Sequence, residues 1–287
     1  MKIASVEHGA DQLWGVITED GEGLLAMTGL AATLRAFLES GGTASDLIGQ
    51  GSRRVPLAEV RWAPPIPQPS KIWCTGLNFD DYRQQLGLDF LDAPNIFLKA
   101  PSALVGHDSE VAIPAGYGSV FDEWELTAVV GRELRNASPE EAQGAIFGYT
   151  ITHDLTLHDL ELVNRDHQQW AKNLDGFAPC GPWIVTPDQI DLSAGLTMRR
   201  YRNGVLEVTS NTSSMRYQPA EILSFISTFS TLLPGDLIPF GTPPAGPCAA
   251  GDSITGEIEG IGALTVHLVG RSTDPQWQTV LTRSANP

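Results

Sequence analysis

Many short runs of β-type residues, each followed by turn residues, divide the chain beyond Ser70, and this pattern restricts the fold more than any other feature. The runs read KIWCTGL, NIFLKA, LTAVVG, AIFGYTIT, LTMRRYRNG, LIPF, SITGEIEG and ALTVHLV. The Asn203-Gly204 pair is a strong hairpin signal. Helical patterns are fewer and lie chiefly at residues 139–143 and 219–228. We therefore expect a mainly β domain of barrel or roll type with short helices.

A proline-rich segment separates this region from the N-terminal part of the chain. Residues 64–70 read PPIPQPS, and such a stiff segment cannot lie inside a helix or a central strand. Before it, KIASV, LWGVI and GLLAM read as short strands, and residues 30–38 read as a helix that Gly41-Gly42 ends. We therefore predict an α+β chain, mainly β, with a small N-terminal α+β domain at residues 1–63, a connector at 64–70 and a larger domain at 71–287.

The charge of the chain excludes several classes of partner. Its 18 Lys and Arg residues stand against 34 Asp and Glu residues, which gives a formal net charge of −16. Nucleic-acid binding needs a basic surface, so we expect no nucleic-acid partner. No apolar run approaches the roughly 20 residues of a membrane span, so we expect no membrane partner. The negative field also repels anionic substrates unless a local cation offsets it.

The N-terminus and the cysteines predict a cytoplasmic protein. The opening MKIASVEHGA has a short apolar start that Glu7 and His8 interrupt, which does not fit a signal peptide. Cys74, Cys180 and Cys248 are an odd, widely spaced set without a CxxC motif. They form neither a disulfide framework nor a zinc signature, and a reducing compartment is the expected location.

Three acidic residues follow or open β-type runs. Glu123 and Glu125 are two apart in FDEWELTAVV, so their side chains share one face of a strand and repel unless a cation lies between them. Taken alone, such a pair is more typical of a solvated edge, and Asp154 after GYTITH is more typical of a turn or cap. The apolar run after Glu125 makes a buried carboxylate pair costly and favours a metal. Three carboxylates from two strands suit Mg²⁺ or Mn²⁺ better than zinc.

Two further sequence features have a functional and a structural interpretation. Lys172 in WAKNLD can bind an anion or stabilise an enolate, although its spacing alone favours a surface lysine. The Gly241-Thr242 turn after LIPF can hold an oxyanion with backbone amides, although turns of this composition are mostly structural.

The order of these features along the chain resembles the fumarylacetoacetate hydrolase family. The resemblance covers roughly residues 70 to 270 and rests on seven blocks in a fixed order: GLNF (76–79), FLKAPSALVG (97–106), DEWELTAVVG (122–131), GYTITHDLTLHDLE (148–161), WAKNLDGFAPCGPW (170–183), LLPGDLIPFGTP (232–243) and GDSITGEIEGIGAL (251–264). It implies a twisted, mixed β-roll at residues 71–287 that is the metal-binding catalytic domain, and a homodimer.

The resemblance also implies roles for individual residues. Glu123, Glu125 and Asp154 match the family's acidic ligands for one divalent cation, Mg²⁺ or Mn²⁺. Lys172 matches its active-site lysine, and Thr242, with Gly241, matches the Gly-Thr-Pro turn that contacts substrate oxygens. The expected partner is therefore a small carbonyl compound, a 1,3-dicarbonyl or a 2-oxo acid.

The chain departs from the family pattern at the residues that activate water. Hydrolases of the family commonly read GLNYxxHxxE, and here Tyr82 and Gln85 occupy the His and Glu positions. A tyrosine, with an ordinary pKa near 10, is a poor general base at neutral pH but can donate a proton to an enolate. His107, His153 and His167 are alternative bases, although strand alternation points His153 away from the face of Asp154.

A second departure affects the substrate carboxylate. Members with a SARDxQ-like run hold it with an Arg and a Gln, and these positions are His158 and Glu161 here. The chain loses a bidentate guanidinium and gains a negative charge, so an anionic substrate end is less favoured. Arg165 lies nearby in the sequence and is a candidate to compensate.

These features predict a divalent-metal-dependent hydrolase that cleaves a carbon–carbon bond of a 1,3-dicarbonyl or 2-oxo compound through a metal-stabilised enolate. The alternative is a metal-dependent decarboxylase, lyase or tautomerase with Tyr82 as proton donor. A less favoured alternative is a non-catalytic binding relative. Hydrolysis requires a base near the metal, so it loses support if residues 80–92, which include Asp80 and Asp81, bring no His or carboxylate there.

Overall fold

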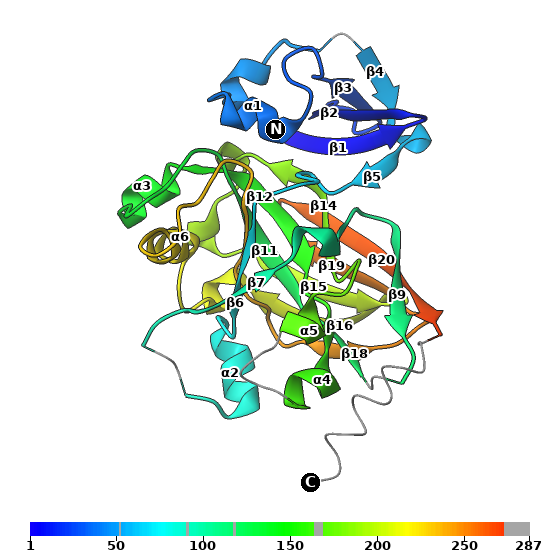
Figure 1. Cartoon of the computed structure of the whole chain (residues 1–287), viewed down its shortest axis with the longest axis vertical. Coiled ribbons are helices and arrows are strands. Elements are labelled where there is room, and N and C mark those ends of the chain that lie inside the picture. The colour runs from blue at the N-terminus through cyan, green and yellow to red at the C-terminus, as the bar shows by residue number, and fades with distance from the viewer. Residues whose placement is uncertain (52, 90–91, 117–118, 164–168, 273–287) are drawn as a thin grey trace.

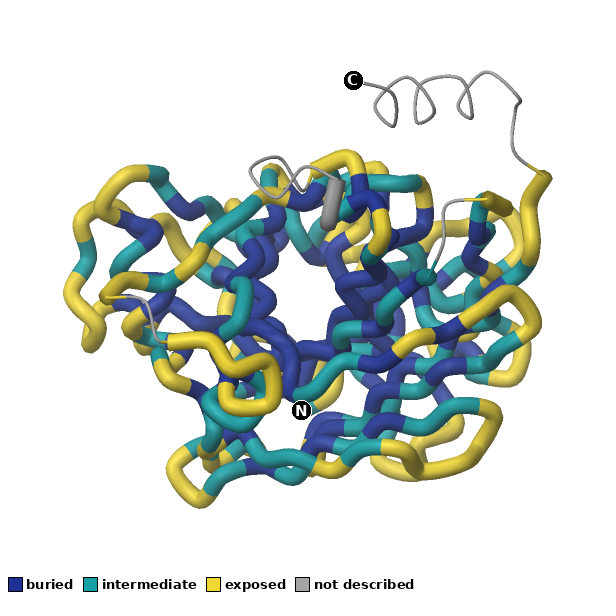
Figure 2. Tube along the Cα trace, turned by 90° about the horizontal axis from the view of Figure 1, so that it is seen from below, coloured by how far each residue is buried: buried dark blue, intermediate teal, exposed yellow. Residues whose placement is uncertain are grey.

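The computed structural model describes residues 1–51, 53–89, 92–116, 119–163 and 169–272. It is mainly β, with short helices at the periphery (Figure 1). Buried residues lie at its centre and exposed residues along its rim (Figure 2). Among the described residues, none of the helices is long and apolar enough to cross a membrane.

The largest sheet in the described part of the chain has 12 strands. Its order is β4 (Arg53–Pro56), β3 (Gly23–Ala26), β2 (Asp11–Ile17), β1 (Lys2–His8), β14 (Ala178–Val185), β12 (Ile146–His153), β11 (Trp124–Val130), β17 (Leu237–Pro239), β6 (Ile72–Gly76) and β7 (Asn95–Lys99), while β5 (Arg61–Ala63) pairs with β1 and β8 (Leu104–Val105) with β14. The β17–β6 and β14–β8 pairs are parallel and the others antiparallel. The sheet is therefore mixed, as predicted.

Two smaller sheets complete the β structure. One contains β16 (Val205–Asn211), β15 (Thr197–Arg202), β19 (Ser253–Ile258), β20 (Gly262–Arg271) and β9 (Ser109–Pro114), and the other contains β13 (Thr156–Leu157), β10 (Val120–Asp122) and β18 (Gly246–Cys248). The predicted hairpin at Asn203-Gly204 joins β15 to β16, with φ values of 52° and 77° that suit a two-residue turn.

The helices are short. They are α1 (Leu34–Glu39), α2 (Asp80–Leu86), α3 (Pro139–Gln143), α4 (His158–Val163), α5 (Gln169–Lys172) and α6 (Pro219–Ser227), with 3₁₀ turns at Ala44–Leu47, Leu57–Glu59, Pro101–Ala103, Pro187–Gln189, Leu192–Ala194 and Thr212–Ser214. Helices α3 and α6 confirm the two helical patterns expected beyond Ser70. Helices α2, α4 and α5, which those patterns do not indicate, lie together at one end of the molecule (Figure 1).

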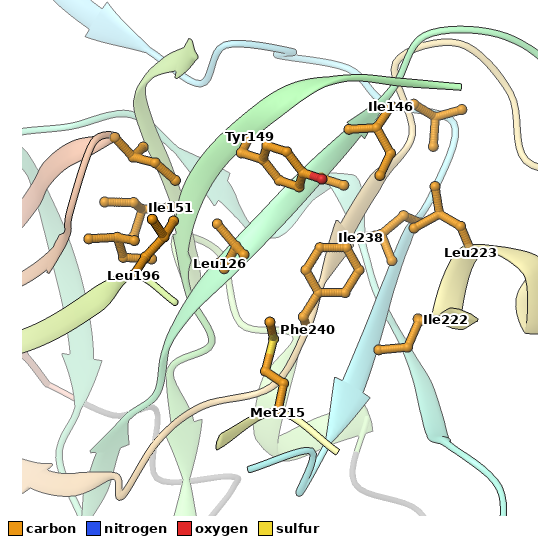
Figure 3. Close-up of a cluster of buried hydrophobic side chains, with 14 of the residues drawn as sticks. Leu126, Ile146, Tyr149, Ile151, Leu196, Met215, Ile222, Leu223, Ile238 and Phe240 are labelled. Carbon is orange, nitrogen blue, oxygen red and sulfur yellow. The ribbon is translucent and has the colours of Figure 1, made fainter. Parts of the chain in front are cut away.

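The core lies against the central strands β11 and β12, whose residues are buried on both faces. Leu126, Tyr149 and Ile151 of these strands pack in one cluster with Phe240 and with α6, whose Ile222 and Leu223 point into the cluster (Figure 3). Because both faces are covered, the two strands form a rigid support for the residues at their ends.

The N-terminal strands continue the largest sheet. Strand β1 pairs with β14 through Lys2–Val185 and Ile3–Ile184, and the buried side chains of Ile3 and Trp14 pack in one cluster with Ile184. Residues 64–71 contain neither helix nor strand. The division of the chain into separate domains at residues 64–70 stays a prediction.

Candidate metal centre and active site

Three carboxylates meet where the central strands end. Glu125 lies on β11, Glu123 lies between β10 and β11, and Asp154 directly follows β12. One oxygen from each lies within 4.8 Å of the other two. The Asp154 amide donates to the Glu123 carbonyl at 2.7 Å, which joins the two chain segments. The structure therefore brings together the three acidic residues, hereafter the acidic cluster, although Glu123 lies at the junction of two strands rather than within one.

The acidic cluster is short of positive charge. Burial raises the pKa of Glu123 from 4.5 to about 7 and that of Glu125 well above its ordinary value, and the neighbouring carboxylates add to both rises. Burial also opposes ionisation of Asp154, but Lys172 and Lys99 outweigh it and lower the pKa of Asp154. A divalent cation would compensate the negative charge of the carboxylates. An all-oxygen donor set fits Mg²⁺ or Mn²⁺.

Lys172 is buried beside the cluster. Its Nζ lies 2.7 Å from Asp154 Oδ2, 3.3 Å from Glu123 Oε2 and 2.7 Å from the Thr156 hydroxyl. Burial lowers the pKa of Lys172, but the charges of Asp154 and Glu123 dominate and raise it above the ordinary value. Lys172 thus stays charged, and the surface-lysine interpretation is wrong because only 3% of its surface is exposed.

The Gly241-Thr242 turn contacts the cluster through its backbone. The Gly241 amide donates to Glu125 Oε2 at 2.7 Å, while the buried Thr242 hydroxyl donates to the Pro243 carbonyl at 2.8 Å. Gly241 has a φ of +85°, and a Cβ there would lie 2.9 Å from the Asn78 Cβ. The close approach and the left-handed backbone both require glycine at this position.

Tyr82 lies on α2, half-buried and within electrostatic range of Glu123. Burial raises its pKa to about 12, with further contributions from the charges of Glu123 and Glu161, so the phenol keeps its proton at neutral pH. Gln85, by contrast, is exposed. The Asp81 carboxylate accepts a hydrogen bond from the Ser210 hydroxyl at 2.5 Å and another from the Tyr82 amide at 2.8 Å. Each of its two oxygens therefore already accepts one hydrogen bond within the protein.

His158 and Glu161 pair with each other on α4. The His158 Nδ1 lies 3.5 Å from Glu161 Oε2, and the His158 ring packs against Phe121 at 4.3 Å between centroids. The charge of Glu161 raises the pKa values of Glu123, Lys172 and Tyr82, so Glu161 lies within electrostatic range of all three. Arg165 and His167 lie outside the described residues. The Nδ1 atom of His107 accepts a hydrogen bond from the Thr265 amide.

Sequence reasoning missed Lys99. This lysine is 1% exposed, and its Nζ lies 2.5 Å from Asp154 Oδ1 and donates to the Lys172 carbonyl. A lysine that ends an apolar strand usually points to solvent, which hides this role. No local pattern shows that this lysine is buried; in the structure Phe97, two residues earlier on the same face of β7, has its ring 5.0 Å from the Lys172 ammonium.

Comparisons with known proteins place this geometry in context. Residues 71–269 match the family model described as fumarylacetoacetate (FAA) hydrolase C-terminal. The chain is 30% identical over 280 residues to the mitochondrial oxaloacetate tautomerase FAHD2B of Bos taurus, covering 91% of this chain and 89% of that protein.

Two solved structures are similar over nearly their whole length. A 5-carboxymethyl-2-hydroxymuconate delta-isomerase from Mycobacterium smegmatis has a TM-score of 0.81 at 30% identity and covers 95% of this chain and 100% of its own. The maleylpyruvate hydrolase from Sphingobium sp. SYK-6, solved with manganese(II) and pyruvate, has a TM-score of 0.78 at 28% identity and covers 94% and 99%.

Proposed function

The chain belongs to the fumarylacetoacetate hydrolase family, and on that premise we propose that it is a divalent-metal-dependent enzyme that processes a 1,3-dicarbonyl or 2-oxo compound through an enolate. The observation that carries the proposal is the acidic cluster, in which three carboxylates converge with too little positive charge around them. Glu123, Glu125 and Asp154 would hold Mg²⁺ or Mn²⁺. When bound, the cation would polarise the carbonyl groups of the substrate.

Lys172 and the Gly241-Thr242 turn would hold the three carboxylates in position for metal binding and for stabilisation of the enolate. The Lys172 ammonium holds Asp154 and Glu123 by its own contacts and adds positive charge where the substrate oxygen becomes negative. The Gly241 amide orients Glu125, and Thr242, the next residue of the turn, would contact substrate oxygens as the family resemblance implies.

Within this class we propose keto–enol proton transfer, in which Tyr82 donates its proton to the enolate carbon while the enol hydroxyl releases its proton to solvent, from which the phenolate is reprotonated. A phenol whose pKa is raised to about 12 is protonated at neutral pH, so Tyr82 can deliver a proton but is not suited to activate water. The relative named oxaloacetate tautomerase supports this reaction class and makes oxaloacetate the first substrate to test.

Carbon–carbon hydrolysis, which the sequence favours, is the second candidate. The similarity to a maleylpyruvate hydrolase supports it, and the Glu161 carboxylate on α4 is a base near the site. A cytoplasmic homodimer remains part of the proposal, on the family resemblance and on the free cysteines Cys74, Cys180 and Cys248.

A turnover screen with Mg²⁺ or Mn²⁺ tests these proposals. Wild type, Tyr82→Phe and Glu123→Gln are compared on oxaloacetate, acylpyruvates and neutral 1,3-diketones, with the enol form followed by absorbance and the products by mass. Enol–keto conversion without a mass change supports the tautomerase, water addition with two fragments supports the hydrolase, and CO₂ loss supports a decarboxylase. Equal activity of Glu123→Gln and wild type would refute the metal site.

A further inference from the structure

Behind the acidic cluster lies a second group of charged side chains, formed by Asp122, His153 and Arg200 and hereafter called the buried charge network. Asp122 and His153 are 0% exposed and Arg200 is 1% exposed. The His153 Nδ1 lies 2.5 Å from Asp122 Oδ1, and Arg200 Nε donates to Asp122 Oδ2 at 2.9 Å. One carboxylate is thus held between an imidazole and a guanidinium.

Two residues of the buried charge network, Asp122 and His153, are adjacent in sequence to candidate metal ligands. Asp122 directly precedes Glu123, and His153 directly precedes Asp154. Neighbouring residues of an extended chain point to opposite faces, so the two ligands point into the site while Asp122 and His153 meet behind it. The Asp122–His153 contact therefore fixes the distance between the two segments from the rear, as the Asp154–Glu123 backbone hydrogen bond does at the front.

Arg200 connects these segments to two further parts of the fold. It lies on β15 of the five-stranded sheet, and its guanidinium also donates to the Gly246 carbonyl at 3.2 Å and pairs with Glu207. Gly246 follows the Gly241-Thr242 turn by a few residues and pairs with Asp122 across β18 and β10. The His153 Nε2 lies 3.1 Å from the Leu264 carbonyl of β20, so the network joins all three sheets behind the ligands.

Stability alone does not account for such a network. A buried ion pair contributes little more to folding than apolar side chains of the same volume, but its directional bonds restrict where its members lie. Groups behind a metal ligand act on the metal by orienting the ligand. Here the orientation passes through single peptide links, from Asp122 to Glu123 and from His153 to Asp154.

We propose that Arg200 and His153 are positioning residues that act through Asp122 to fix the spacing of the Glu123 and Asp154 carboxylates, and thereby set the affinity of the site for a divalent cation. This inference rests on the proposed metal site.

The test measures Mn²⁺ affinity and folding separately in the full-length protein. Arg200→Lys keeps the charge but loses the planar fork, and His153→Asn shortens the link to Asp122. Asp236→Asn is the control. Like Asp122, Asp236 is a fully buried carboxylate in an ion pair, with Lys71 at 2.7 Å. It lies next to Val130, at the end of β11 that is far from the acidic cluster. Free Mn²⁺ is followed by electron paramagnetic resonance, and thermal unfolding is recorded on the metal-free protein.

We expect Arg200→Lys and His153→Asn to weaken Mn²⁺ binding by about 10- to 100-fold, while Asp236→Asn lowers the unfolding temperature and leaves the Mn²⁺ Kd unchanged. The inference is overturned if the two network variants behave like Asp236→Asn, with lower unfolding temperatures and wild-type Mn²⁺ affinity. If Arg200→Lys does not fold, His153→Asn decides by the same criterion. If wild type itself binds no Mn²⁺, the proposed metal site fails together with the inference.

Discussion

Replacing Glu123 by glutamine should stabilise the metal-free protein at neutral and alkaline pH. Glu123 has a pKa of about 7 in the folded protein against an ordinary 4.5. This rise of roughly 2.5 units corresponds to about 3 kcal/mol, at 1.36 kcal/mol per unit. Glutamine keeps an oxygen that can accept from the Lys172 ammonium, which lies 3.3 Å from Glu123, but it cannot ionise.

The sign of the effect follows from proton linkage. The folded state raises the pKa of Glu123. The contribution of this group to the stability of wild type is therefore fully present below about pH 4.5 and is lost as the pH rises through about 7. The glutamine variant does not undergo this loss. The free energy of unfolding of the variant, relative to wild type, should therefore increase by about 3 kcal/mol between about pH 4.5 and pH 8. For a chain of 287 residues this corresponds to a difference of about 5 °C in Tm.

The assay is thermal unfolding of both proteins after treatment with EDTA, followed by circular dichroism across this pH range. Mn²⁺ at about a thousandfold excess over its Kd should add about 4 kcal/mol to wild type alone and reverse the order of the two proteins. A difference between the proteins that does not grow with pH would refute the argument from burial. Equal stabilisation of both by Mn²⁺ would refute the assignment of Glu123 as a ligand.

Three further predictions concern single residues of the site. Tyr82→Phe should lower kcat for keto–enol conversion by about 10²- to 10⁴-fold with KM nearly unchanged, and a wild-type kcat would contradict the role of the phenol as proton donor. Lys99→Met should lower the free energy of unfolding by about 3 kcal/mol in urea titrations, because it removes one of the two cations that hold the buried Asp154; a loss below about 1 kcal/mol would show that Lys172 suffices. Gly241→Ala should weaken Mn²⁺ binding by about tenfold or more, because its Cβ would displace the amide that orients Glu125. Gly204→Ala, at another positive φ but in open space, is the control, and equal Mn²⁺ affinity of the two variants would contradict the argument.

Local patterns predicted part of the fold, whereas the acidic cluster was expected only once the family resemblance was added to them. Alternation along an extended chain correctly placed Glu123 and Glu125 on one side, although Glu123 lies between two strands rather than within one. The same rule correctly pointed His153 away from the face of Asp154. The order of the sequence blocks then identified the family, which the comparisons confirm.

The parts that could not be predicted depend on contacts distant in sequence. Lys99 reaches Asp154 across 55 residues, and Arg200 reaches Asp122 across 78. The run LTMRRYRNG contains three arginines, and nothing local shows that Arg200 is the buried one. Helices α2 and α4 have seven and six residues, too few for an apolar periodicity to appear.

The pairing of β1 with β14 has a consequence for how the chain avoids association. Besides β12, strand β14 pairs with β1 through Ile184 and Val185 and with β8 through Ala178 and Pro179. A chain that began after residue 63 would leave the backbone of Ile184 and Val185 without its β1 partner, in a strand whose residues are nearly all buried. Such an open edge is a template for intermolecular strand pairing. The N-terminal strands therefore cover this part of β14, and their removal should favour intermolecular strand pairing there.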